Sequence, residues 1–82
     1  MIYRLEMLLK SSNRLVVVDA TIDSCAIGKS RYFSVHHDYC RCVLVISEAK
    51  VDSFLKGTLV WGTYFPPKDE GKRTIVYLAR VV

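Results

Sequence analysis

The sequence predicts a small α+β domain: a mainly antiparallel, twisted β-sheet of five to six short strands in three hairpins, with one α-helix packed on one face. Eleven of the 82 residues are valine, which favours strand over helix. Several segments alternate between apolar and polar residues, as half-buried strands do. Only residues 47–56 combine helical spacing with helix end signals. A chain of this length forms one domain, so we expect a single unit over 1–82.

The first two segments predict a hairpin. In residues 1–9 every odd position is apolar, the period-two pattern of a half-buried strand. Residues 11–13 form a cluster of turn-forming residues, and the valine-rich segment 14–21 returns as the second strand. From 22 to 30 the pattern breaks, which predicts an irregular connection ending near Gly28.

The next two segments predict a second hairpin. Alternation resumes over 31–36, where Phe33 and Val35 share one face. Residues 37–39 are expected to form the hairpin tip. The following segment, 40–46, ends in four consecutive aliphatic residues, a run that suits a strand covered on both faces.

The helix is expected from about 47 to 56. Ser47 can cap its N-terminus and Glu48 is favoured by the helix dipole. Val51 and Phe54 fall on one face, and Gly57 tolerates the left-handed conformation that often ends a helix.

A third hairpin follows. Residues 58–65 predict a strand that Pro66-Pro67 terminates, because proline cannot donate to a sheet. After a charged loop over 68–72, the last strand, 73–82, is nearly all apolar. At a sheet edge such a strand would pair with another chain, so we expect it to be central or to pair across a homodimer interface. A homodimer is the predicted state.

Composition sets broad limits on location and partners. The net charge of +4 includes no run of five like charges and is compatible with nucleic acid or an acidic protein surface. Arg4 and Glu6 interrupt the first apolar segment, and no apolar stretch approaches the ~18 residues of a membrane span. We therefore expect a cytoplasmic protein without membrane contact. Three cysteines exclude complete intrachain pairing and favour reduced thiols.

Gly28-Lys29-Ser30 matches the end of a phosphate-binding P-loop, but its context does not. Asp23 stands where the first glycine of that motif is required, and a strand pattern follows where a helix should begin. The interpretation we favour is a turn glycine.

A cluster of histidines and cysteines could hold a metal ion or act as a thiol sensor. The candidate ligands are Cys25, His36, Cys40 and Cys42. Cysteines that fill the core and histidines at a hairpin tip explain the same residues more simply, so no cofactor is expected.

The candidates for catalysis are His36 and His37. Imidazoles titrate near neutral pH, and nearby cations could hold a phosphate, as in a small metal-independent nuclease. Such chemistry requires an acid, a base and a cation to converge on one atom.

Two stretches, 29–41 and 61–73, combine cations with aromatic residues, as binding surfaces do. Trp61 fits the core better than a binding hot spot, and Gly62 beside it marks a bulge or a close backbone approach. We expect a non-catalytic adaptor or inhibitor-type module that presents a basic, aromatic surface to a protein or nucleic acid and takes no small-molecule substrate. Its candidate contacts are Lys29, Arg31, Tyr32, His36, Arg41, Trp61, Tyr64, Lys68, Lys72 and Arg73.

Overall fold

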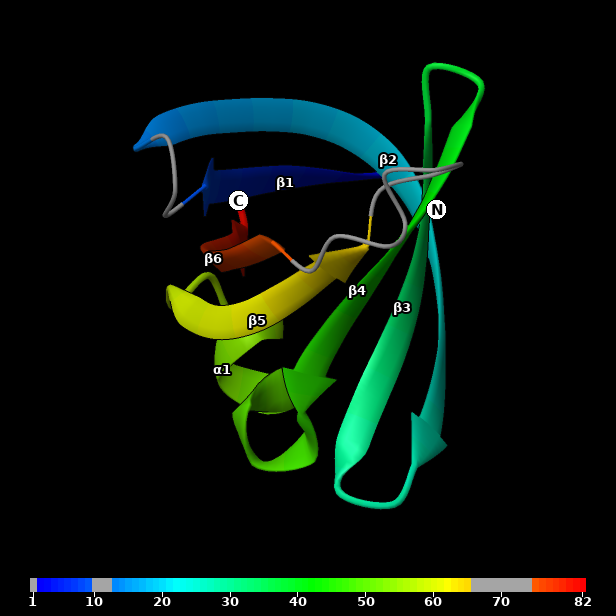
Figure 1. Ribbon diagram of the computed structural model, residues 1–82, viewed down its shortest axis with the longest axis vertical. Helices are drawn as coiled ribbons and strands as arrows, with labels where there is room; N and C mark the ends of the chain where they lie inside the picture. Colours follow the sequence, from blue (N-terminus) through cyan, green and yellow to red (C-terminus); the bar gives the residue numbers. More distant parts are fainter. Residues whose placement is uncertain (1, 10–12, 66–74) are drawn as a thin grey trace.

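The computed structural model describes residues 2–9, 13–65 and 75–82 (Figure 1). Within these ranges six antiparallel strands close into a barrel, each strand pairing with its neighbour in the sequence and the last with the first. The strands are β1 (Ile2–Leu9), β2 (Arg14–Ile27), β3 (Ser30–His37), β4 (Cys40–Ser47), β5 (Val60–Phe65) and β6 (Ile75–Val81).

The predicted open α+β sheet is therefore wrong. The antiparallel order is as expected, but β6 pairs with both β5 and β1, which closes the sheet on itself. Closure depends on contacts such as that between Glu6 and Arg80, which lie 74 positions apart. No local sequence pattern reports a pairing over that separation.

The helical segment is shorter than predicted and does not cover a sheet face. A 3₁₀ turn, η1 (Glu48–Lys50), leads into α1 (Val51–Leu55), beside the end of β4 and the start of β5 (Figure 1). Ser47 makes no side-chain capping bond; the backbone N–H of Glu48 instead donates to the carbonyl of Lys29 at 2.8 Å. The helical segment is therefore tied to the turn between β2 and β3.

The connection expected over 22–30 is mostly strand. β2 continues to Ile27, because its first part pairs with β1 and its second part with β3. Backbone pairing outweighs the turn preference of Asp23 and Ser24, both exposed on this strand. The turn itself is Gly28-Lys29, with Gly28 at φ +60°, as the turn-glycine interpretation predicted. The next turn is Asp38-Tyr39, one residue shorter than the expected tip.

Alternate residues of each strand fill the barrel. Phe33 and Val35 are buried, as the alternation of β3 predicted. Val43 and Val45 of β4 remain partly exposed on the outer face, so this strand is covered on one face only. The side chain of Phe54 enters the core against Phe33, with ring centroids 5.3 Å apart. The buried core comprises Leu5, Met7, Ala20, Phe33, Val35, Cys42, Leu44, Ile46, Val51, Phe54, Val60, Tyr77 and Ala79.

Two glycines have specific structural roles. Gly57 follows α1 at φ +95°, as predicted for the residue that ends the helix. Gly62 allows β5 to approach β4 closely, because a Cβ there would lie 3.1 Å from the carbonyl oxygen of Val45. The predicted close backbone approach is confirmed.

The last strand lies centrally between two neighbours, so an open edge at β6 no longer supports a dimer.

The predictions for Pro66-Pro67, for the loop 68–72 and for Lys68, Lys72 and Arg73 fall outside the described residues. In the described ranges, no helix has the length and apolar character needed to cross a membrane.

Candidate nucleic-acid interface

The outer faces of β3, β4 and β5 bring several predicted contact residues together. Tyr32 lies opposite Val45 on β4, which in turn lies opposite Thr63 on β5. His36 lies four positions further along β3, opposite the exposed Arg41. These side chains alternate with the buried residues of their strands, so they share the outer surface.

Trp61 lies on this surface and not in the core, contrary to the interpretation favoured above. It pairs with Leu78 on the outer side of the barrel and is 54% exposed. Both faces of 60–65 carry apolar residues, so alternation alone does not identify the inward face. The inward positions belong to Val60, Gly62 and Tyr64, and Gly62 lies opposite the buried Tyr77.

Two open depressions adjoin Trp61. One, of about 330 Å³, lies toward the helical segment and includes Lys50 and Leu59. The other, of about 420 Å³, lies toward the turn between β2 and β3 and includes Lys29 and Thr63. Ser47 and Trp61 border both. The indole is therefore flanked by hydroxyl groups and ammonium groups, which suits a ligand with flat rings and negative charges.

The cations of this surface differ in their availability. Lys29, Lys50 and Arg41 are exposed and form no ion pair with any residue in the described ranges. Each can therefore contact an anion without first breaking an ion pair to one of those described residues.

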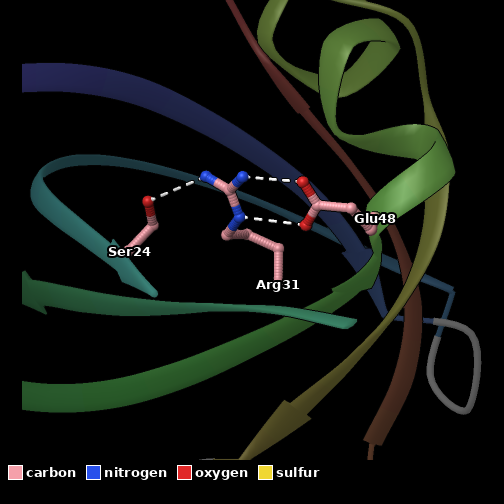
Figure 2. Close-up of polar contacts among 3 residues, drawn as sticks. All are labelled: Ser24, Arg31 and Glu48. Carbon is pink, nitrogen blue, oxygen red and sulfur yellow. Dashed lines mark hydrogen bonds and ion pairs between the residues drawn. The ribbon is translucent and has the colours of Figure 1, made fainter. Parts of the chain in front are cut away.

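Arg31, by contrast, is engaged within the chain (Figure 2). Its Nε and Nη2 donate to the two carboxylate oxygens of Glu48 at 3.0 and 2.7 Å, and its Nη1 donates to Ser24 Oγ at 3.3 Å. The hydrogen bonds to Glu48 raise the pKa of Arg31 above its ordinary value. This arginine ties β2 and β3 to the helical segment, and its charge is compensated there.

The two histidines contact partners on opposite sides of β3. His36 Nε2 lies 3.9 Å from Asp23 on the outer face, whereas His37 Nε2 lies 3.6 Å from the buried thiol of Cys42. Both border an open depression of about 360 Å³ at the tip of the hairpin, with Arg41 nearby. The two imidazoles therefore contact different partners, and their convergence with a cation on one atom stays a prediction.

Three of the four predicted metal ligands have described side chains, and these three are not brought together. Cys25 is exposed on the outer face opposite Tyr32, whereas Cys42 is buried on the inner face. His36 is also on the outer face, and the side chain of Cys40 is outside the described part of the chain. Among the described side chains, no three Cys, His, Asp or Glu residues form a metal-binding group.

Sequence reasoning missed a buried polar cluster inside the barrel. Tyr64, expected on the binding surface, lies on the inner face and donates its hydroxyl to Cys42 Sγ at 2.8 Å. Its ring contacts that of Tyr77 edge-on, with centroids 5.6 Å apart. The nearly uniform apolar character of 75–79 gave no signal that Tyr77 would point inward.

Comparison of the chain with protein-family models, with curated proteins and with solved structures finds no match. The function is therefore inferred from the geometry.

Proposed function

We propose that this protein binds single-stranded nucleic acid across the outer faces of β3, β4 and β5. The observation that carries the proposal is the position of Trp61, half exposed between two depressions that contain Lys29 and Lys50. Exposed aromatic rings stack on bases, and lysines beside them contact phosphates, without requiring a particular sequence.

The arrangement of charge supports this choice of surface. On the β1 and β6 side of the barrel, Arg4 is paired with Asp19 and Arg80 with Glu6. Those arginines are therefore partly neutralised, whereas the cations next to Trp61 form no ion pair with a residue of the described ranges. A phosphate backbone is attracted most strongly to the uncompensated side.

The strand geometry permits more than one stacking contact. Adjacent strands lie ~4.8 Å apart and successive residues ~3.3 Å apart. Tyr32 is two strands from Thr63, and Trp61 is two residues from Thr63 along β5. The two rings are therefore about 12 Å apart, and they can contact different bases of one strand.

The test uses the fluorescence of Trp61, the single tryptophan of the chain. A pyrimidine oligonucleotide of about 16 nucleotides, matched to the upper range of site sizes for small barrels, is expected to quench it. Contacts from Lys29, Lys50 and Arg41 predict a slope of about −2 when the logarithm of the affinity is plotted against that of the salt concentration.

Two variants locate the site. Trp61→Ala, measured by anisotropy of a labelled oligonucleotide, is expected to cost about 1–3 kcal/mol, or roughly 5- to 150-fold in affinity. Lys29→Ala should reduce the salt slope by about 0.7. Arg4→Gln, an exposed arginine paired on the other side of the barrel, is the charge control and should leave the affinity nearly unchanged. Absence of binding at low salt, or equal losses in Arg4→Gln and Lys29→Ala, would refute the proposal.

A second candidate, protein docking or homodimerisation, rests on a separate observation. An outer row of apolar side chains crosses four strands in register: Leu15, Leu8, Leu78 and Trp61. Leu15 and Trp61 are each more than half exposed. Exposed apolar rows of this kind are typical of protein interfaces.

Leu15 separates the two candidates, because it belongs to the apolar row and lies outside the proposed nucleic-acid site. Leu15→Asp should dissociate a dimer in sedimentation experiments and leave oligonucleotide binding intact. A native protein that is monomeric at micromolar concentration would remove the homodimer. The cytoplasmic location stays a prediction.

A further inference from the structure

We propose that two copies of this chain pair edge to edge through the first half of β2, as antiparallel strands related by a twofold axis. The proposal rests on the homodimer named above as part of the second candidate, and it commits that dimer to backbone pairing at one sheet edge. It involves no residue of the proposed nucleic-acid surface.

The first support is an open edge of the sheet. Residues 14–21 of β2 pair with β1, whereas residues 21–27 pair with β3. Among the described strands, residues 14–20 therefore have a partner on one side only. In Figure 1 this half of β2 runs along the top of the molecule, with β1 beneath it.

The direction of the backbone groups identifies which residues face this edge. The N–H of Val82 donates to the carbonyl of Arg4 at 2.8 Å, so Arg4 directs its backbone groups toward the β6 side of β1. Neighbouring residues of a strand alternate in this respect, so Leu5 bonds to β2, where it lies opposite Val18. The even positions of this half of β2 therefore bond to β1, and the odd positions, Val17 among them, direct their N–H and C=O groups to the open edge.

The second support is that this edge lacks the features that keep strands apart. Edges that do not associate usually carry a charge, a proline or a bulge. Residues 15–18 are Leu-Val-Val-Val, and their register with β1 is continuous. The outward side chains of Leu15 and Val17 are 56% and 51% exposed. The edge therefore presents backbone groups and uncovered apolar side chains together, as a template for another strand.

The third support is that the edge is complementary to itself. With the twofold axis at Val16, Leu15 of each copy lies opposite Val17 of the other, so apolar side chains cover one another on the outer face. Both residues direct backbone groups to the edge, so each such pair can form two hydrogen bonds. Antiparallel pairing also brings the end that carries Arg14 in one copy to the end that carries Asp19 in the other. An axis at Val17 would place Leu15 opposite Asp19, so the apolar pattern selects the first register.

Sedimentation equilibrium tests the edge. The native protein should be dimeric at high micromolar concentration. Val17→Pro removes one edge-facing N–H from each copy and none that bonds to β1. Because two backbone hydrogen bonds are lost per dimer, the affinity should fall about 5- to 150-fold. Leu78→Ala is the matched control, because Leu78 belongs to the outer apolar row but lies on β6, two strands from β2; it should leave the affinity unchanged.

Disulfide formation tests the register. At the twofold axis the two copies of residue 16 form a non-hydrogen-bonded pair with Cα atoms about 4.5 Å apart, within the range that a disulfide spans. In a Cys25→Ser background, Val16→Cys should therefore give a disulfide-linked dimer with oxidised glutathione as the oxidant. Val18→Cys lies on the same face of the strand, but its two copies would be about 13 Å apart, so it should not.

The outcomes separate this proposal from the others. A native protein that is monomeric overturns it together with the homodimer. A dimer that Val17→Pro does not weaken, or that Leu78→Ala weakens equally, overturns the edge and leaves the apolar row as the interface. If Val17→Pro fails to fold by circular dichroism, equal crosslinking of Val16→Cys and Val18→Cys, or of neither, overturns the edge as well. Folded Val17→Pro should bind oligonucleotides like the native protein, which keeps this test apart from that of nucleic-acid binding.

Discussion

Replacing Phe54 with alanine should remove much of the stability of this barrel. Phe54 is the principal apolar residue that α1 contributes to the core: it is fully buried, and its ring packs on Phe33 with centroids 5.3 Å apart. The α1 segment is too short to be stable without such packing. Loss of the ring therefore leaves a cavity and removes much of the packing that holds the helical segment on the barrel.

The expected magnitude follows from the burial. Phe-to-Ala changes in packed cores cost about 3–5 kcal/mol. A domain of 82 residues has a total free energy of unfolding of about 4–12 kcal/mol at typical stability per residue. Phe54→Ala should therefore lose a quarter of the stability at least, and it unfolds the protein if the native value is at the low end.

Urea unfolding followed by far-ultraviolet circular dichroism measures the difference. Leu55→Ala is the matched control, because Leu55 is the next residue of the same helix and is 46% exposed. It should cost less than about 1 kcal/mol, in line with surface positions. A loss below about 1.5 kcal/mol for Phe54→Ala, or equal losses for the two variants, would refute the packing role assigned to this ring.

Three further predictions concern other contacts. Tyr77→Phe should be at least as stable as the native protein, because the buried hydroxyl that it removes has no hydrogen-bond partner among the described residues. The stability of this variant should also fall less than that of the native protein as the pH rises above about 10. There the unfolded native chain ionises Tyr77, whereas the folded state, in which the pKa of Tyr77 is raised, does not. Urea unfolding of both proteins at neutral pH and above about pH 10 checks this. Glu48→Gln should lower the melting temperature, because the amide keeps only one of the two oxygens that accept from Arg31 and removes the negative charge; an unchanged melting temperature would contradict that role. Gly57→Ala should destabilise by about 1–2 kcal/mol in urea, since φ is +95° and the added Cβ would meet a backbone carbonyl at 3.1 Å, whereas Gly28→Ala, with open space around it, should cost less.

Local periodicity predicted the strands that pair with close neighbours. The inward faces of 1–9 and 31–36 were identified correctly, because side-chain alternation is a property of each strand alone. The extension of β2 through Asp23 was not, because that strand owes its length to pairing with β1 and then with β3. Tertiary pairing there outweighed the local preference for a turn.

For the candidate site, the sequence identified the types of residue present, but for 60–65 it did not identify which face of the strand each residue occupies. It indicated that Tyr32 and His36 share an outer surface with Arg41, and the register of β3 with β4 agrees. It placed Trp61 inside and left Tyr64 outside, and the structure reverses both. Either side of 60–65 could be buried by composition, and only the pairing with β6 decides between them.

The sequence itself determined the order of the strands, the buried face of the strands that alternate, and the presence of a short helical segment. Each of these depends on residues that lie close together in the chain. Closure into a barrel, the exposure of Trp61 and the meeting of His37 with Cys42 beneath the hairpin were decided by tertiary structure. These depend on the register between distant strands, which is selected by the free energy of the whole packed core and not by the preference of any one segment.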